Sequence, residues 1–171
     1  MKENILIFST KRLAVRRFRA EDAELLYRYS GEPDKKEIPT EVYDSLEATK
    51  RELDLVIANY RIMHFPFRYA IVLKEENRLI GDLSFKRLPD YNTQINIKIA
   101  DEYQRKGYGT EVLKASAEYA KVRLGLDRVY ALVKADNAAG RGMVEKADFL
   151  LEKEFEKDWF GVKAPVCRYI I

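Results

Sequence analysis

The segment Gln104–Thr110, which contains two glycines, constrains the fold more than any other part of the chain. It follows residues 94–100, where polar and apolar residues alternate as in a strand, and it leads into residues 107–124, where apolar residues recur at helical spacing. Glycine adopts backbone conformations closed to other residues, and the first turn of a helix offers unpaired N–H groups and a positive dipole end. With Arg105 and Lys106 adding positive charge, the segment predicts a site for a phosphate or pyrophosphate.

Two familiar nucleotide-binding motifs do not fit this segment. A GxGxxG turn needs a third glycine where the chain has Val112, and a P-loop needs a Gly-Lys-Ser/Thr sequence that is absent. A turn with a purely structural role is the alternative interpretation, because glycines are common in turns.

The remaining pattern predicts one mixed sheet with helices packed on it, an α/β (α+β) fold. The middle of the chain is strand-like, and the second half alternates strands with helices. The Pro89–Thr93 turn separates two of the predicted strands and favours an antiparallel hairpin. The expected strands are Thr10–Phe18, Tyr69–Leu73, Leu79–Leu88, Gln94–Ala100, Arg128–Val133, Phe149–Phe155 and Val166–Ile171, and the expected helices are one that begins near Asp22, Leu46–Tyr60, Gly107–Leu124 and Ala138–Ala147.

Length and composition exclude several classes of protein. A chain of 171 residues without a Pro/Gly/Ser-rich linker is expected to form a single domain, residues 1–171. With 31 basic and 28 acidic residues, the formal charge of +3 is too balanced for a nucleic-acid-binding protein. No apolar run is long enough to cross a membrane, and residues 1–10 lack a secretory signal, so we expect a cytoplasmic protein. The single His64 and the single Cys167 exclude an intramolecular disulfide bond and argue against a metal site.

Four groups of residues together resemble the GNAT acetyltransferases, the GCN5-related N-acetyltransferases. The residues Gln104-x-x-Gly107-x-Gly109 match the pyrophosphate motif of that family, Gln/Arg-x-x-Gly-x-Gly/Ala. Further matches are Leu124–Val129 at the exit from the helix, Asn137-Ala138-Ala139 followed by Glu145, Lys146 and Phe149, and Thr10-Lys11-Arg12-Leu13 with Asp22. They follow the family's order over nearly the whole chain, which is most similar to the subgroup of ribosomal-protein and polyamine acetyltransferases.

This resemblance implies an acetyl-CoA site in a V-shaped split between two parallel strands, residues 94–100 and 128–133, of a mostly antiparallel sheet with helices on both faces. Backbone groups of the first strand would bond to the acetyl and pantetheine amides, and the glycine turn would hold the pyrophosphate. Lys134 and Arg141 are candidates for the outlying phosphate, with ordinary surface charge as the alternative. The implied cofactor-binding residues are Ile97, Lys98, Ile99, Gln104, Arg105, Lys106, Gly107, Tyr108, Gly109, Thr110 and Asn137.

The activity that the resemblance implies is transfer of an acetyl group from acetyl-CoA to a primary amine of a small molecule or a protein N-terminus. The amine would attack the thioester directly in a ternary complex, and a backbone N–H would stabilise the oxyanion that develops. Residues 10–67 would form the acceptor site, where Glu37 and Glu41 could attract a cationic amine.

The usual proton-transfer residues of the family are absent from this chain. Its common glutamate base is replaced by Gln94, which cannot accept a proton at neutral pH, and Gly140 and Val144 stand where serine and tyrosine acids are found. The late glycine of the family is replaced by Asp148. Three explanations are open: the amine arrives neutral or loses its proton to water, another side chain is the base, or the protein is a CoA-binding regulator without turnover.

Alternation with a period of two places six polar residues of the predicted hairpin on one face of the sheet. Asp82 is the candidate for a substitute base there, and a solvated sheet surface is the alternative. The segment Trp159–Gly161 is expected to cap the closing hairpin, with an acceptor-site or homodimer contact as the alternative. His64 is expected in a surface or packing position, and Cys167 as a buried, unreactive thiol. The six polar residues are Asp82, Ser84, Lys86, Gln94, Asn96 and Lys98.

Overall fold

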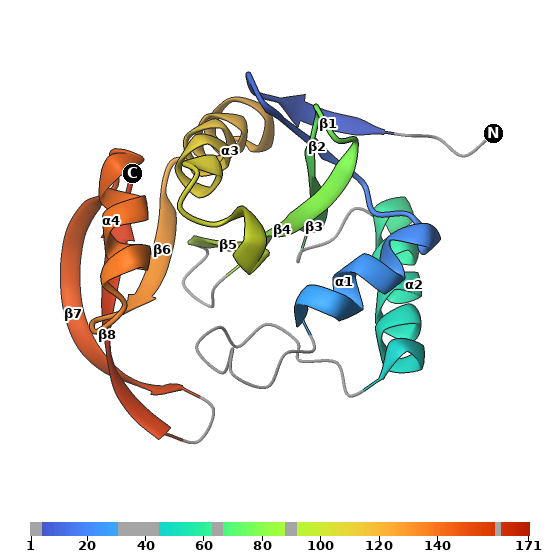
Figure 1. Cartoon of the computed structure of the whole chain (residues 1–171). Coiled ribbons are helices and arrows are strands. Elements are labelled where there is room, and N and C mark those ends of the chain that lie inside the picture. Colours follow the sequence, from blue (N-terminus) through green and yellow to red (C-terminus); the bar gives the residue numbers. More distant parts are fainter. Residues whose placement is uncertain (1–4, 31–44, 63–66, 88–91, 160–161) are drawn as a thin grey trace.

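A computed structural model describes residues 5–30, 45–62, 67–87, 92–159 and 162–171. Over these residues, eight strands form one sheet in the order β1-β2-β3-β4-β5-β6-β8-β7, with helices around it (Figure 1). The strands are β1 (Leu6–Ser9), β2 (Leu13–Arg16), β3 (Phe67–Leu73), β4 (Arg78–Arg87), β5 (Thr93–Ile99), β6 (Val129–Lys134), β7 (Leu150–Trp159) and β8 (Val162–Ile170). The helices are the 3-10 turns η1 (Ala20–Asp22) and η2 (Asp101–Tyr103), and α1 (Ala23–Ser30), α2 (Leu46–Ile62), α3 (Tyr108–Leu124) and α4 (Ala138–Lys146).

The sheet is mixed, as the sequence predicts. Neighbouring strands in the described part of the chain run antiparallel, except β5 and β6, which are parallel. The predicted β4–β5 hairpin is confirmed, with Asp82 opposite Lys98 and Ser84 opposite Asn96, while residues 88–91 of its turn lie outside the described residues. The register therefore sets the predicted polar residues side by side on one face.

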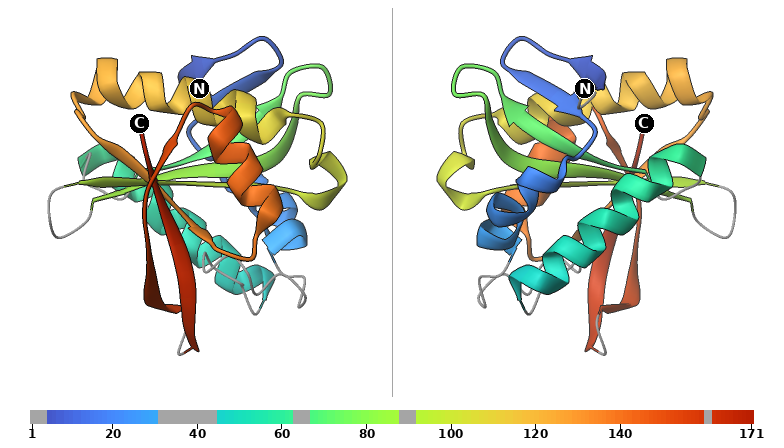
Figure 2. Two further views of the ribbon diagram at one scale, coloured as in Figure 1. Left: turned by 90° about the vertical axis from the view of Figure 1, so that its left-hand side faces the viewer. Right: turned by 90° about the vertical axis from the view of Figure 1, so that its right-hand side faces the viewer.

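Helices cover both faces of the sheet, which confirms the predicted architecture. Figure 2 shows α3 on one face and α2 on the opposite face, where α1 packs beside it. Helix α4 contacts α3, β6 and β7. Every residue of β3 is buried, because the strand is covered on both faces of the sheet. Such a strand does not show the alternation of polar and apolar residues that a half-exposed strand has.

The N-terminal part of the chain differs from the single strand expected over Thr10–Phe18. It forms two antiparallel strands, β1 and β2, joined by a tight turn in which the Leu13 N–H donates to the Thr10 hydroxyl at 3.0 Å. The second strand ends where the Arg16 guanidinium donates to both oxygens of Asp22, at 2.7 and 2.8 Å. Both boundaries depend on particular side-chain hydrogen bonds, which the alternation of polar and apolar residues does not reveal.

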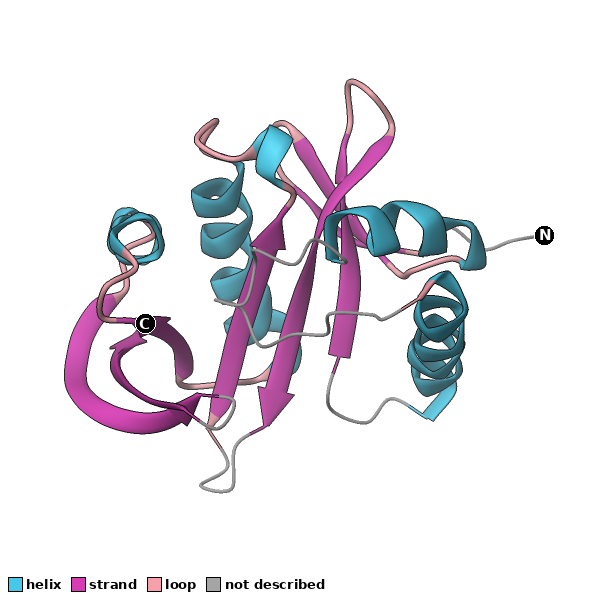
Figure 3. Ribbon diagram, turned by 60° about the horizontal axis from the view of Figure 1, so that its bottom comes forward, coloured by secondary structure: helices cyan, strands magenta, loops and turns pink. Residues whose placement is uncertain are grey.

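The closing hairpin is longer than expected. The first of its strands was expected to end at Phe155 and the second to begin at Val166, but β7 continues to Trp159 and β8 begins at Val162. Figure 3 shows this β7–β8 hairpin curving away from the central strands. Most residues of β7 are exposed and charged, so the sequence there lacks the apolar alternation by which strands are identified.

Candidate active site

The parallel strands β5 and β6 diverge and leave a cavity between them. They pair only at Thr93 with Val129 and at Gln94 with Tyr130, and farther along β5 the described pairing ends (Figure 3). A cavity of about 1050 Å³ opens there, lined by both strands, the start of α3, helix α4 and the far end of β7. The structure therefore contains the V-shaped split that the resemblance implied.

The glycine turn enters this cavity at the start of α3. The helix begins at Tyr108, one residue later than expected, because Gly107 is its N-cap residue with φ at +79°, a left-handed conformation that favours glycine. Arg105 also has a positive φ, +59°. The amide of Gln104 ties the turn to the end of β5 by donating to the Ile99 carbonyl at 2.9 Å. No side chain caps this helix start, so its first N–H groups are suited to binding an anion.

Gly109, in the first turn of α3, lies close to helix α4. A Cβ atom at this position would stand 2.5 Å from the sulfur of Met143, closer than real Cβ contacts occur. Both residues line the cavity. A side chain at position 109 would therefore push Met143 aside and occupy cavity space beside the first turn of α3.

Eight of the eleven expected cofactor-binding residues line the cavity, and three do not. The side chain of Lys98 is buried at the Asp82 end of the polar face, near the ring of Tyr29. Lys106 extends over Tyr103, and the Tyr108 ring lies 4.4 Å from the guanidinium carbon of Arg12. The eight that line the cavity are Ile97, Ile99, Gln104, Arg105, Gly107, Gly109, Thr110 and Asn137.

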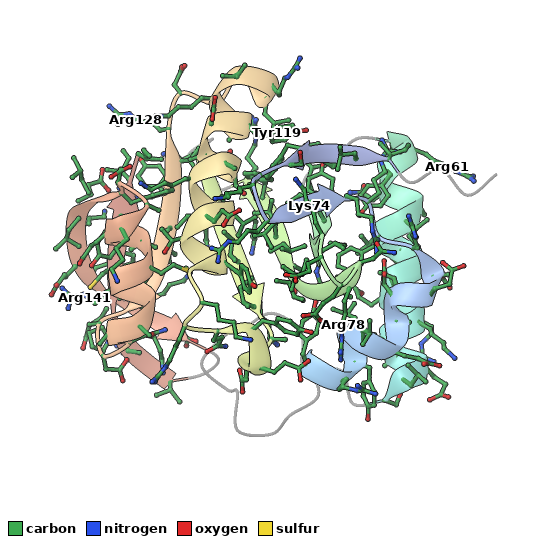
Figure 4. The ribbon with its side chains drawn as sticks, turned by 45° about the horizontal axis from the view of Figure 1, so that its top comes forward. Arg61, Lys74, Arg78, Tyr119, Arg128 and Arg141 are labelled. Atoms are coloured by element: carbon green, nitrogen blue, oxygen red, sulfur yellow. The ribbon has the colours of Figure 1, made fainter. Side chains whose placement is uncertain are left out.

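Asn137 and the two candidate phosphate partners differ in where they point. Asn137 caps α4, because its side-chain oxygen accepts the Gly140 N–H at 2.8 Å. Lys134 lines the cavity, but Arg141 donates to the Tyr169 hydroxyl at 3.0 Å on the side of α4 toward β8 (Figure 4). Of the two candidate cations, only Lys134 is among the residues that line the cavity.

The polar face of β4 and β5 reaches the cavity at one end. Gln94 donates to Asn96 at 2.6 Å, and Asn96 donates to the Ser84 hydroxyl at 3.3 Å. Gln94, Asn96 and Lys86, which stands opposite Gln94, line the cavity. This end of the face therefore offers hydrogen-bonding groups to a bound molecule. These groups are amides, because Gln94 stands where the family commonly has a glutamate.

Asp82, the candidate base, lies at the other end of the polar face. It is 5% exposed and is not among the residues that line the cavity. The Arg68 guanidinium donates to one of its oxygens at 2.9 Å, and the Tyr29 hydroxyl donates to the other at 3.2 Å. Both oxygens are thus hydrogen-bonded within the protein and the carboxylate neutralises Arg68, while its role as a base stays a prediction.

The other residues singled out in the sequence lie away from the cavity or outside the described chain. Cys167 is buried in β8, and burial followed by its hydrogen bond to Glu154 raises the pKa of the thiol, which favours the predicted unreactive state. His64, Glu37 and Glu41 fall outside the described residues, as do the last two residues of the Trp159–Gly161 segment.

Several residues at the cavity were not identified from the sequence. Met143 comes from α4, and Lys157 and Asp158 come from the far end of β7. None of them belongs to a local motif, so no pattern signalled them.

Among the described residues, no helix is long and apolar enough to cross a membrane, and no group of three or more His, Cys, Asp or Glu side chains could hold a metal ion.

Comparison with solved structures gives the same fold over nearly the whole chain. A GNAT-family acetyltransferase from Bacillus anthracis has a TM-score of 0.83 at 23% identity, covering 98% of both chains. A ribosomal-protein-S5-alanine acetyltransferase from Vibrio fischeri has a TM-score of 0.79 at 20% identity, covering 96% of this chain and 94% of that one. A spermidine N-acetyltransferase from Vibrio cholerae, solved with CoA and spermine, has a TM-score of 0.79 at 20% identity, covering 95% and 96%.

The sequence itself matches the family model of the acetyltransferase (GNAT) domain over residues 12–150. It is also 26% identical over 151 residues to the uncharacterized N-acetyltransferase YnaD of Bacillus subtilis (strain 168), covering 87% of this chain and 85% of that protein. The family model spans most of the chain and includes both strands of the split, the glycine turn and α4. The protein is therefore an acetyltransferase that belongs to the GNAT family.

Proposed function

We propose that this protein transfers the acetyl group of acetyl-CoA to a primary amine, and that the cavity between β5 and β6 holds both reacting groups. The observation that supports this most is the divergence of the two strands, which pair at only two positions before the cavity opens. A pantetheine chain laid between them would supply hydrogen-bond partners to strand backbone that has left the ladder. The chain matches the model of the GNAT acetyltransferase domain, a family that uses acetyl-CoA.

The pyrophosphate is assigned to the N–H groups of residues 105–110, where the uncapped start of α3 favours negative charge. The backbone of residues 97–99 is assigned to the acetyl and pantetheine amides. Because the Asn137 oxygen already accepts the Gly140 N–H, its amide nitrogen is the atom that would donate to the cofactor.

The proposed reaction is direct transfer within a ternary complex. The amine nitrogen forms a bond to the carbonyl carbon of the thioester, the carbon–sulfur bond breaks, and the proton of the amine ends on the departing thiol. Gln94 and Asn96 are placed to hold the amine or a water molecule at the cavity, but neither amide can accept the proton. The amine is therefore expected to arrive neutral or to lose its extra proton to water, and the proton released on attack is expected to reach the departing sulfur through water.

A screen of acceptors tests this proposal directly. The protein is incubated with acetyl-CoA and with polyamines, aminoglycosides, other small amines or ribosomal N-terminal peptides, and both free CoA thiol and acetylated product are measured. Acetylated product with any of them supports the proposal. Tight CoA binding without product for the whole panel would instead support a CoA-binding regulator.

Binding of CoA is expected to raise the melting temperature. At about 100 times its dissociation constant, a ligand that binds only the folded state adds about 2.7 kcal/mol to the free energy of unfolding. Adenosine is expected to add much less, because it has neither the pyrophosphate nor the pantetheine that the turn and the split would bind. Thermal unfolding with each ligand makes the comparison, and equal shifts from adenosine and CoA would contradict the proposed placement.

The change Gly109→Val is expected to weaken CoA binding at least about tenfold, or about 1.4 kcal/mol, because the phosphate must approach the backbone where the new side chain stands. Titration calorimetry on the folded variant measures this. Since the new Cβ also crowds Met143, the controls are Met143→Ala and the double variant. If the double variant regained the affinity of Met143→Ala alone, crowding rather than phosphate approach would explain the loss.

A further inference from the structure

Arg12, in the turn between β1 and β2, contacts the glycine turn at the start of α3. Its guanidinium donates to the Lys106 carbonyl at 2.9 Å, and its charge lies 4.4 Å from the centre of the Tyr108 ring. A Cβ added to Gly107 would stand 3.3 Å from the same guanidinium, so the group packs directly against the turn. Arg12 is not among the residues that line the cavity.

Glu111, in the first turn of α3, completes the contact with the N-terminal turn. Its carboxylate accepts hydrogen bonds from the Arg12 N–H at 2.9 Å, from the Arg12 guanidinium at 2.6 Å and from the Thr10 hydroxyl. Partial burial alone would raise the pKa of Glu111, but the hydrogen bonds from Thr10 and Arg12 lower it below its usual value. The residue is therefore negatively charged at neutral pH.

A carboxylate at this position has an electrostatic consequence for the helix N-terminus. The positive end of α3 is where an anion is favoured, and a second negative charge nearby would repel it. The ion pair with Arg12 compensates that charge, and the Arg12 guanidinium also donates to the Lys106 carbonyl, which fixes the orientation of this peptide group. The Arg12 side chain thus fixes the backbone of the turn and neutralises Glu111.

We infer that Arg12 is a positioning residue for the pyrophosphate: it holds the 105–110 turn in its anion-binding conformation without touching the ligand. This inference rests on the proposed function of the turn. It predicts that loss of Arg12 weakens the binding of ligands that contain pyrophosphate and leaves the binding of pantetheine alone unchanged.

The test compares Arg12→Ala with wild type by calorimetry, using CoA and pantetheine as ligands. The dissociation constant of CoA is expected to rise about tenfold, the usual effect of losing charge-assisted hydrogen bonds, whereas that of pantetheine is unchanged. In turnover, the KM for acetyl-CoA is expected to rise while kcat stays near the wild-type value. Arg12→Lys keeps the charge but not the forked geometry, so it is expected to restore only part of the affinity.

Arg78→Ala is the matched control. Arg78 is another partly exposed arginine that pairs with a carboxylate, Glu102 at 3.4 Å, and lies over the ring of Tyr103 without a described contact to the turn. It is expected to bind CoA as wild type does. The inference about Arg12 would be overturned if folded Arg12→Ala bound CoA as tightly as wild type. It would also be overturned if Arg12→Ala and Arg78→Ala lost the same CoA affinity, or if Arg12→Ala lost the same affinity for CoA and for pantetheine. Failure of the wild-type protein to bind CoA would instead overturn the proposed function.

Discussion

Replacing Asp82 with asparagine is expected to lower the free energy of unfolding by about 3–5 kcal/mol, because it removes one partner of a buried ion pair. The side chains of Arg68 and Asp82 are only 8% and 6% exposed, and Lys98, directly opposite Asp82, is also buried. Without the carboxylate, the buried Arg68 would lose a counter-charge that water cannot replace. Urea or thermal unfolding of the purified variant measures the loss.

The same variant decides whether Asp82 takes part in proton transfer. Its matched control is Asp22→Asn, which disturbs a similarly buried pair, with Arg16, at residues that do not line the cavity. Both variants are expected to lose stability and to keep the pH dependence of the wild-type rate at temperatures where they are folded. A wild-type rate that levels off near pH 6–7, and that loses this plateau only in Asp82→Asn, would identify Asp82 as the base.

Gln94→Glu is expected to raise the rate of acetyl transfer near pH 7 by about 10²-fold, the lower end of what a positioned general base contributes. The position lines the cavity, where the existing amide donates to Asn96. A carboxylate there can be accommodated, because Asn96 can rotate its amide to donate to it, and the Ser84 hydroxyl can then donate to the Asn96 oxygen. Lys86, opposite in the sheet, would favour the charged form of the new group.

The pH dependence separates this effect from a general change in the site. The wild-type rate is expected to climb toward the pKa of the acceptor amine, because without a protein base it follows the fraction of free amine. The variant is expected to level off at a lower pH, where its new carboxylate is already ionised. Asn96→Asp serves as the control for any carboxylate in this part of the cavity, and an equal gain in that variant would show that position 94 is not special.

The glycine turn at the start of α3 could be predicted from the sequence because its determinants are local. The spacing of Gly107 and Gly109 between an alternating segment and a helical one marks the turn without knowledge of any distant residue. The alternation of polar and apolar residues along β4 and β5 likewise predicts six polar side chains on one face of the sheet. The register of the two strands confirms this prediction. The mixed sheet with helices on both faces followed from the order of elements together with the family resemblance.

The tertiary structure decided the features that join distant parts of the chain. The sequence could not show that Asp82 pairs with Arg68, that Arg12 reaches Glu111 and the glycine turn, or that Met143 limits the space at Gly109. The first two of these are single side-chain contacts between elements that folding brings together, and they leave no periodicity in the sequence. The reason is physical: backbone conformation and burial depend on neighbouring residues and repeat along an element, whereas the partner of a charge is whichever group the packed fold places within hydrogen-bonding distance.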